Sequence, residues 1–350
     1  MENPLGGAEF APAQTYLNTS TCGLLPRRTV DAITALAEQN AAGRPDGAGD
    51  FEVVDAVRER FARLVGVRPD RVALGGAVTV HVALIAGSLA PGAEVLFAEG
   101  DFSSVITPFT VRGDLKTRFV PLEELADAVR PQTALVAFSA VQSADGRVAD
   151  LPAVREAAAA HGARTLLDVS QSAGWLPLDA SAWDYTVAGG YKYLMCPRGA
   201  SFLTVGEEAQ ESLVPAHAGW VAAESPFDST YGPVERFAPT ARRYDEPPSF
   251  LAYYGAEQSL ALLEEIGVDA VRAHGTALAE RFRSGLAELG HEPVRADGSV
   301  VVAVPGLGGL RPELARAGVI VSARAGNLRV SFHLYNSAAD VDRALDVLSS

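Results

Sequence analysis

The 350-residue chain is long enough to bury a sizeable core, since 48% of its residues are hydrophobic. Its 43 acidic and 29 basic side chains give a formal net charge of -14, which disfavours binding to nucleic acid or to an anionic membrane surface. Two cysteines, Cys22 and Cys196, are too few for a disulfide framework and lack the spacing of a structural metal site. No stretch approaches the roughly 18 consecutive apolar residues of a membrane span, and the N-terminus has no secretory signal pattern. We therefore expect a cytoplasmic protein without nucleic-acid or membrane partners.

Helical and strand patterns alternate through the first part of the chain. After an irregular N-terminal arm, a helical pattern covers residues 57–66. Apolar, β-branched runs predict strands at 71–76, 94–99, 133–140, 164–170 and 185–190. Further helical patterns lie between these strands, at 77–90, 122–129 and 151–162. Strands that are apolar throughout suit a mostly parallel sheet covered on both faces, so the pattern predicts a doubly wound α/β domain.

The composition changes after this domain. Residues 215–233 are rich in Pro, Gly and aromatic residues, and a connection of this length is more typical of a functional loop than of a linker. A long helix is expected over 250–267, followed by a helix-strand-helix-strand-helix series that ends at 338–348. We expect three parts: an N-terminal arm (1–20), a large α/β domain (21–240) and a small α/β C-terminal domain (241–350).

Two polar residues close neighbouring apolar strands, where ligands of an open α/β sheet collect. Asp168 ends one strand, with Gln171 in the turn that follows, although a lone aspartate at such a place often only caps the next helix. Lys192 lies in an apolar, glycine-rich run just past the next strand. Burial there would lower the pKa of its ammonium group and leave a nucleophilic amine. Taken alone, Lys192 could equally extend its charge to the surface.

Together these segments resemble the class V aminotransferase family, a group of pyridoxal 5'-phosphate (PLP) enzymes that includes cysteine desulfurases, kynureninases, isopenicillin N epimerase-like enzymes and carbon-sulfur lyases. The resemblance extends from YLNTSTCGLLP (16–26) to LRVSFHLYN (328–336). It implies the PLP-dependent transferase fold type I and a homodimer. By this similarity Lys192 would hold PLP as a Schiff base, Asp168 would pair with the pyridinium nitrogen and Gln171 would reach the ring hydroxyl. A buried carboxylate at that nitrogen keeps it protonated, as an electron sink requires.

Further residues match the cofactor site of the family. After a glycine pair, the amides of Ala77 and Val78 and the hydroxyl of Thr79 would receive the phosphate at a helix N-terminus. Relatives usually have hydroxyl residues at the first two positions, so backbone contacts would carry more of the binding here. Phe102 stands where relatives place the residue that stacks on the ring, with an ordinary core position as the alternative. Tyr191 replaces the histidine of the desulfurases, as in the kynureninase-like branch.

Substrate contacts are expected on other segments. Arg329 stands where relatives bind the α-carboxylate of the substrate, and the alternative is an edge-strand arginine that faces water. Gln142 and Ser143 match a family strand that approaches the site, and we assign Gln142 to the substrate and Ser143 to the cofactor. In the aromatic connection, Trp220 and Tyr231 are candidate readers of the substrate side chain, although packing explains either position equally well.

The desulfurase nucleophile has no counterpart, because residues 319–330 contain no cysteine. We interpret Cys22 and Cys196 as small buried thiols. The chain is therefore predicted to be a PLP lyase that eliminates the β-substituent of an amino acid, such as a cysteine S-conjugate, with Lys192 as general base. Kynureninase-like hydrolysis, epimerisation, transamination and decarboxylation coupled to oxidative deamination use the same cofactor and stay open. A catalytically inactive binding protein would have lost the lysine or the aspartate. Serine-hydrolase, nicotinamide and zinc-enzyme motifs are missing, and no metal is expected.

Overall fold

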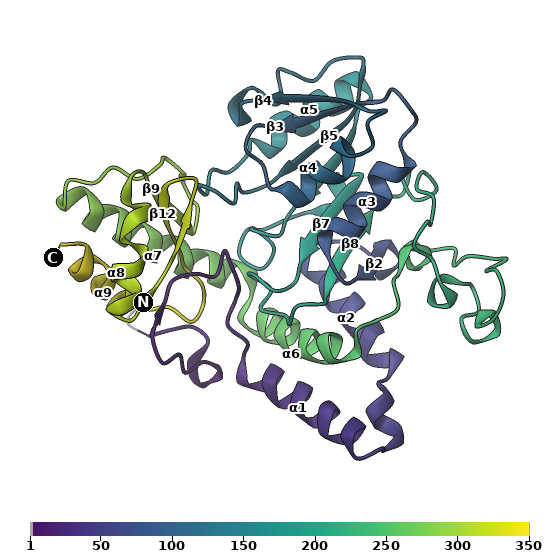
Figure 1. Ribbon diagram of the computed structural model, residues 1–350, viewed down its shortest axis with the longest axis horizontal. Coiled ribbons are helices and arrows are strands. Elements are labelled where there is room, and N and C mark those ends of the chain that lie inside the picture. Colours follow the sequence, from purple (N-terminus) through teal and green to yellow (C-terminus); the bar gives the residue numbers. More distant parts are fainter. Residues whose placement is uncertain (1–2, 350) are drawn as a thin grey trace.

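The computed structural model describes residues 3–349 and shows a large α/β part beside a smaller one (Figure 1). A seven-stranded sheet forms the centre of the large part, with the order β2-β8-β7-β6-β5-β3-β4. Neighbouring strands are parallel except at β8, which is antiparallel to both β2 and β7. The strands are β2 (Val72–Gly75), β3 (Glu94–Ala98), β4 (Lys116–Val120), β5 (Thr133–Ser139), β6 (Arg164–Asp168), β7 (Tyr185–Gly189) and β8 (Ser201–Val205). The predicted mostly parallel, doubly wound sheet is confirmed.

Helices cover both faces of this sheet and bury two apolar layers. Successive residues of a strand point to opposite faces, so Leu96 of β3 packs in one layer and Val95 in the other. One layer is completed by α2 (Phe51–Leu64), α5 (Leu151–His161) and α6 (Phe250–Ile266), and the other by α3 (Val78–Ser88) and α4 (Ser103–Thr110). Because both faces are covered, the strands are apolar throughout, as parallel strands of this fold require.

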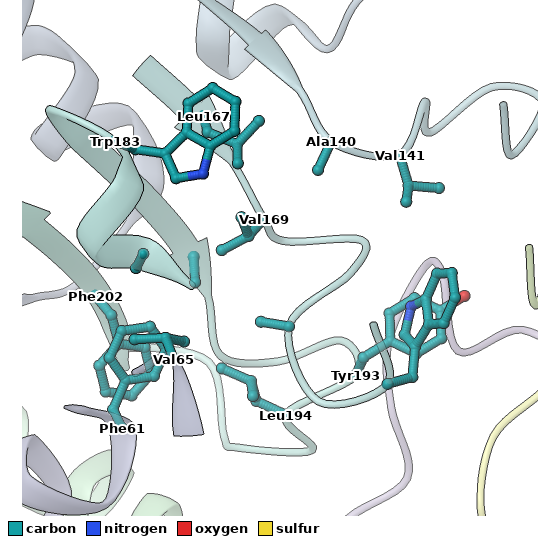
Figure 2. Packing of buried hydrophobic residues seen from close by; sticks show 14 of the residues in the cluster. Phe61, Val65, Ala140, Val141, Leu167, Val169, Trp183, Tyr193, Leu194 and Phe202 are labelled. Carbon is teal, nitrogen blue, oxygen red and sulfur yellow. The ribbon is translucent and has the colours of Figure 1, made fainter. Parts of the chain in front are cut away.

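The segment that follows Lys192 is anchored in the first of these layers. Figure 2 shows Tyr193 and Leu194 among the side chains of this layer, and both are almost completely enclosed. In the same layer, the rings of Phe61 from α2 and Phe202 from β8 stack with their centroids 4.0 Å apart. Protein interiors are packed too tightly for such a segment to shift freely. Core packing therefore holds the backbone on the C-terminal side of Lys192.

The smaller part has an antiparallel three-stranded sheet of order β11-β12-β9. Its elements are α7 (Val268–Glu288), β9 (Val301–Val304), α8 (Arg311–Arg316), β11 (Ser322–Arg324), β12 (Asn327–Ser331) and α9 (Ala338–Leu348). A separate parallel pair joins β1 (Thr15–Tyr16) to β10 (Val319–Ile320). The segment expected to be an N-terminal arm is thus tied to the smaller part by backbone pairing, while residues 1 and 2 of that arm lie outside the described residues.

Three details differ from the sequence expectations. The predicted helix over 122–129 is wrong, because only a short 3₁₀ helix (Leu122–Glu124) followed by turns is present. Prolines at 121 and 131 leave too short a stretch between β4 and β5 for several helical turns. Strand β4 was not predicted because it is a largely exposed, polar edge strand, and β8 was not distinguished from the apolar run after Lys192. Among residues 3–349, no helix combines the length and apolar composition that crossing a membrane requires.

Helix α6 lies after the expected domain boundary at residue 241, yet it packs against the large part. It packs along α2 on one side and along α1 (Arg27–Ala41) on the other, so it lies under the large sheet (Figure 1). Buried hydroxyls of Thr29 in α1 and Ser259 in α6 are 2.8 Å apart. We propose that the small domain begins after Ile266, because the apolar face of α6 is buried against the large part.

A buried ion pair fixes the loop before α6 to the sheet. Arg58 of α2 donates to Asp245 with its Nη2 atom 2.7 Å from Oδ2, and both side chains are almost fully enclosed. The other carboxylate oxygen of Asp245 accepts from the backbone amide of Leu74 in β2 at 2.9 Å. Burial raises the pKa of Asp245, whereas the charge of Arg58 lowers it. This pair therefore links α2, β2 and the loop 241–249.

We expect Arg58→Ala to lower the free energy of unfolding by about 3–5 kcal/mol, because the substitution leaves the Asp245 carboxylate buried without its partner. Arg63→Ala is the matched control. Arg63 lies on the same helix and pairs with Glu264 at 2.8 Å, but it is half-exposed, so its loss should cost less than about 1 kcal/mol. The double variant Arg58→Ala/Asp245→Ala should regain part of the loss. Urea unfolding curves measure all three, and equal losses for the two single variants would contradict the assignment.

Candidate active site

A cavity of about 190 Å³ opens where the carboxyl ends of β2, β3, β6 and β7 meet. Its lining combines small, polar and ionisable residues from the loops that follow these strands. They are Gly76, Ala77, Val78, Thr79, Phe102, Ser104, Asp168, Ser170, Gly189, Tyr191, Lys192, Arg198, Gly199, Ala200 and Ser201. This is the edge at which the sheet topology predicts a ligand.

Lys192 is buried in this cavity between two aromatic rings. Its Nζ atom lies 5.0 Å from the ring centroid of Phe102 and 5.8 Å from that of Tyr191. Burial lowers the pKa of the ammonium group, and the nearby Asp168 carboxylate opposes this effect. The alternative in which Lys192 extends to the surface is therefore wrong. A lowered pKa increases the fraction of Lys192 present as the neutral amine, which is the form that acts as a nucleophile or a base.

The backbone at Lys192 leaves no room for a side chain at position 23. A Cβ atom at Gly23 would lie 2.1 Å from the Lys192 carbonyl oxygen, so a side chain at position 23 would displace one of the two segments. The Gly23 amide donates to the carbonyl of Tyr191 at 2.9 Å. Three residues after the lysine, Met195 adopts a φ of 54°, which is uncommon outside glycine. The N-terminal segment is thus pressed against the Lys192 turn.

Asp168 ends β6 with its carboxylate buried at the same cavity. Its Oδ1 atom accepts from the backbone amide of Ser170 at 2.7 Å. Turns rather than an α-helix follow it, so the helix-cap interpretation of Asp168 is wrong. Burial raises the pKa of Asp168, and the charge of Lys192 lowers it. The Ser170 hydroxyl accepts from the Gly189 amide at 2.9 Å and so joins the ends of β6 and β7.

The N-terminus of α3 faces another side of the cavity. Ala77 precedes the helix without a side-chain hydrogen bond to it, and Ala77, Val78 and Thr79 all line the cavity. The first amides of a helix have no partners within the helix and favour an anion. Thr79 donates to the Ser104 hydroxyl at 3.3 Å. On the outer side of the turn, the Glu246 carboxylate accepts from the Gly76 amide at 2.7 Å and holds the glycine turn in place.

Gln171, Ser143 and Arg329 form a hydrogen-bonded group beside this cavity. The Nε2 atom of Gln171 donates to the carbonyl of Ser20 at 3.0 Å and to the hydroxyl of Ser143 at 3.1 Å. Its Oε1 atom is buried without a hydrogen-bond partner. Unsatisfied buried polar atoms are rare in proteins, so this amide oxygen marks a place where a ligand or water would bind.

Arg329 is a buried cation without an acidic partner. Only 1% of its surface is exposed, and it lies on β12, the central strand of the small sheet, so the edge-strand alternative is wrong. It donates to the carbonyl of Ser143, to Thr21 Oγ1 at 2.9 Å and to Ser322 Oγ at 3.0 Å. Within residues 3–349, no acidic side chain pairs with it. Burial lowers the pKa of Arg329 to about 10. A buried, uncompensated guanidinium is costly and suits a site that receives a carboxylate.

Three predicted substrate residues lie elsewhere in this chain. The amide of Gln142 donates to Asp101 at 3.2 Å, which occupies it in a buried structural network. Trp220 lines a separate cavity with Phe51, at the side of the molecule where the 215–245 loop extends (Figure 1). Tyr231 is 93% exposed. None of the three lines the Lys192 cavity: Gln142 is held by Asp101, and the 215–245 loop carries Trp220 and Tyr231 elsewhere.

Several cavity residues were missed by the sequence analysis. Ser104 and Ser170 each lie two residues after a predicted site residue, Phe102 and Asp168 respectively. Their position in the same strand-end turns was the signal in the sequence that could have identified them. Ser201 begins strand β8, which was itself not predicted. Arg198 lines the cavity with its guanidinium 4.0 Å from the ring centroid of Tyr191. Its contact could not be read from the sequence because it depends on the turn between β7 and β8.

Comparison with known proteins decides the family. The family model described as Aminotransferase class-V matches residues 15–344. The chain belongs to the class V aminotransferase family. It is 29% identical over 320 residues to the uncharacterized aminotransferase YcbU of Bacillus subtilis, covering 86% of this chain and 84% of that protein. Isopenicillin N epimerase of Amycolatopsis lactamdurans is 30% identical over 394 residues, with 96% and 95% covered.

A solved structure supports the same fold. The cystine C-S lyase C-DES, in complex with its reaction product cysteine persulfide, superposes with a TM-score of 0.87 at 22% identity, covering 97% of this chain and 98% of that one. The fold is therefore the PLP-dependent transferase fold type I of this family. The cofactor is pyridoxal 5'-phosphate, and the enzyme acts on amino acids.

The side chains at the cavity fit this cofactor. We propose that Lys192 holds its aldehyde, that Asp168 binds the ring nitrogen and that the N-terminus of α3 receives the phosphate. The unpartnered Oε1 of Gln171 marks where the ring hydroxyl would bind, after rotation of the amide or donation by the hydroxyl. Phe102 and Tyr191 would flank the ring with their faces.

The chain contains only two lysines, Lys192 and the exposed Lys116, so the attachment site can be mapped without ambiguity. We expect borohydride reduction of the PLP-loaded protein to leave the cofactor on the peptide that contains Lys192, because its amine is buried with a lowered pKa. Peptide mass spectrometry measures this. Lys116→Arg serves as the control and should not change the labelling. Labelling of Lys116 alone, or unchanged labelling after Lys192→Arg, would contradict the assignment.

Proposed function

We propose that this PLP enzyme is a carbon-sulfur lyase that releases a thiol from an S-substituted cysteine. The observation that carries the proposal is a cavity with a buried lysine, a buried arginine beside it that has no acidic partner, and no cysteine among the lining residues. Lys192 lies in the cavity and Arg329 lies beside it, whereas neither Cys22 nor Cys196 lines the cavity. A desulfurase needs a cysteine nucleophile that accepts the sulfur, so sulfur would leave with its carbon substituent instead.

Both cysteines are poorly suited to nucleophilic chemistry. Cys196 is fully buried, and burial raises the pKa of its thiol. Cys22 is half-buried, and burial raises the pKa of its thiol as well, against the opposing charge of Arg198. The thiolate is the reactive form, so a raised pKa keeps both residues inert near neutral pH. This agrees with their interpretation as structural thiols.

Arg329 would select the bond that breaks. Its guanidinium is held by Ser322 and Thr21, so its orientation is set before substrate arrives. A substrate α-carboxylate that pairs with it would be restrained at that end, which favours removal of the α-hydrogen over loss of carbon dioxide. We infer that deprotonation, not decarboxylation, is the first chemical step.

Lys192 would act as the general base for that step. PLP, when bound, supplies an electron sink for the charge that develops at the α-carbon. Once the substrate amine has displaced Lys192 from the cofactor, the freed Lys192 amine would accept the α-proton, and burial favours its neutral form. The electron pair of the C-H bond then forms a carbon-carbon double bond while the C-S bond breaks and the thiolate leaves. A proton completes the thiol, and one water molecule converts the remaining fragment to pyruvate and ammonia.

The likeness to the cystine C-S lyase C-DES, at 22% identity, establishes the fold alone and does not separate this reaction from its rivals. Kynureninase-like hydrolysis, epimerisation, transamination and decarboxylation-coupled oxidative deamination would use the same lysine and aspartate. These reactions differ in their products, so products discriminate among them.

We also propose that the enzyme works as a C2 homodimer. The loop 215–245 exposes large apolar side chains, with Phe227 75% and Tyr231 93% accessible. Exposed aromatic residues of this kind are typical of interfaces. In a dimer, the partner's loop could reach the cavity that the chain's own loop does not. We expect sedimentation to give twice the monomer mass at micromolar concentration. A fully active monomer would contradict the proposal.

We expect the loaded enzyme to release thiol and pyruvate in equal amounts from an S-alkyl-L-cysteine, because the protein offers no cysteine to retain the sulfur. Thiol reagents and a coupled pyruvate assay measure the two products. Lys192→Arg should abolish both, with a loss of at least about a thousandfold expected for removal of a general base together with the cofactor anchor. Carbon dioxide with an aldehyde, or alanine with anthranilate from kynurenine, would assign one of the rival reactions instead.

A further inference from the structure

Two arginines share a single hydroxyl beside the proposed carboxylate site. The Thr21 Oγ1 atom accepts from Arg329 Nη2 at 2.9 Å and from Arg324 Nη2 at 3.3 Å. Arg324 also donates to the carbonyl of Ala323 at 2.8 Å. No acidic side chain within residues 3–349 pairs with either guanidinium. Two like charges are therefore held close together by neutral hydrogen-bond partners.

The register of the β11-β12 hairpin explains this arrangement. Ser322 pairs with Arg329, and two residues on Arg324 pairs with Asn327, so all four side chains belong to the same face of the hairpin. The turn that closes it places Ala325 at a φ of 48° and Gly326 at 81°. A non-glycine residue in the left-handed region is uncommon. The hairpin thus sets the spacing of Arg324 from Arg329.

The electrostatic surroundings are unusual for this chain. The whole protein carries a formal net charge of -14, and many arginines in the described region pair with an acidic side chain, as Arg58 and Arg63 do. Here the charges of Arg329 and Arg324 both lower the pKa of Lys192, and Arg324 lowers that of Arg329. Asp168 is the acidic group that opposes them at Lys192. One α-carboxylate would neutralise Arg329 and leave Arg324 without a counter-ion.

We infer that the substrate is an amino acid with a second acidic group on its side chain, and that Arg324 binds this group while Arg329 binds the α-carboxylate. This inference rests on the proposed function for the α-carboxylate contact, and it adds the class of side chain. Arg324 and Arg329 lie diagonally across the β11-β12 pair, and because one Thr21 oxygen accepts from both, at 3.3 and 2.9 Å, their Nη2 atoms are at most about 6 Å apart. This spacing is close to the separation of the two carboxylates in a dicarboxylic amino acid with three or four intervening atoms. Arg324 is exposed, so it can contact the side-chain acid at the solvent-facing end of a bound substrate.

The test compares two substrates of equal shape that differ only in charge. S-carboxymethyl-L-cysteine carries the second carboxylate, and S-carbamoylmethyl-L-cysteine has an amide in its place. Binding to the PLP-loaded enzyme is followed by the change in cofactor absorbance, which does not require turnover. We expect the acid to bind roughly 10- to 100-fold more tightly than the amide, the range of a charge-assisted hydrogen bond. L-glutamate against L-glutamine provides a second pair.

Arg324→Gln should reduce this preference to within about threefold while the affinity for the amide stays the same. Arg155→Gln is the matched control, because Arg155 is an exposed arginine on α5 away from the cavity. It should keep the full preference. Equal affinity for acid and amide in the unmodified enzyme, no binding of either acid, or a preference that survives Arg324→Gln would overturn the inference. Because binding is measured separately from products, absence of thiol release would refute the lyase and leave the binding preference intact.

Discussion

The burial of charge at the junction of the two parts is the constraint on which the site depends. Asp168, Lys192 and Arg329 are all buried, yet they come from three different places: β6, the turn after β7, and β12, respectively. Isolated buried charges are costly, so each must be balanced by a partner or by a ligand. Asp168 and Lys192 oppose each other's pKa shift, whereas Arg329 has only neutral partners. The protein is thus organised around an incomplete set of charges that cofactor and substrate would complete.

The N-terminal segment holds this set together. Leu17 accepts from the Ser331 amide at 3.0 Å in the small sheet, and Ser20 contacts the Tyr193 hydroxyl at 2.7 Å next to Lys192. Thr21 reaches both arginines of the hairpin. A segment far from the site in sequence therefore connects the large part to the small sheet, and its backbone and hydroxyl contacts hold Lys192 and Arg329 at a set distance from each other.

The same arrangement explains how one fold supports several reactions. The residues proposed to hold the cofactor are Lys192, Asp168 and the N-terminus of α3, and all lie at the carboxyl ends of strands in the large sheet. Selectivity would come from more exposed positions, such as Arg324 on its hairpin, that can change without disturbing the sheet.

The sequence by itself indicated five of the seven strands of the large sheet and the helices α3 and α5, because continuous apolar runs and helical periodicity are local properties. It did not indicate the polar edge strand β4 or the strand β8. It also indicated Asp168, Lys192 and Phe102, since residues that directly follow parallel strands meet at one edge of the sheet. Only the tertiary structure decided that Arg329 is buried without a counter-ion, that Arg324 shares its hydroxyl partner and that Trp220 lies in a different cavity. These facts depend on contacts between segments hundreds of residues apart, and no local pattern encodes the distance between such segments.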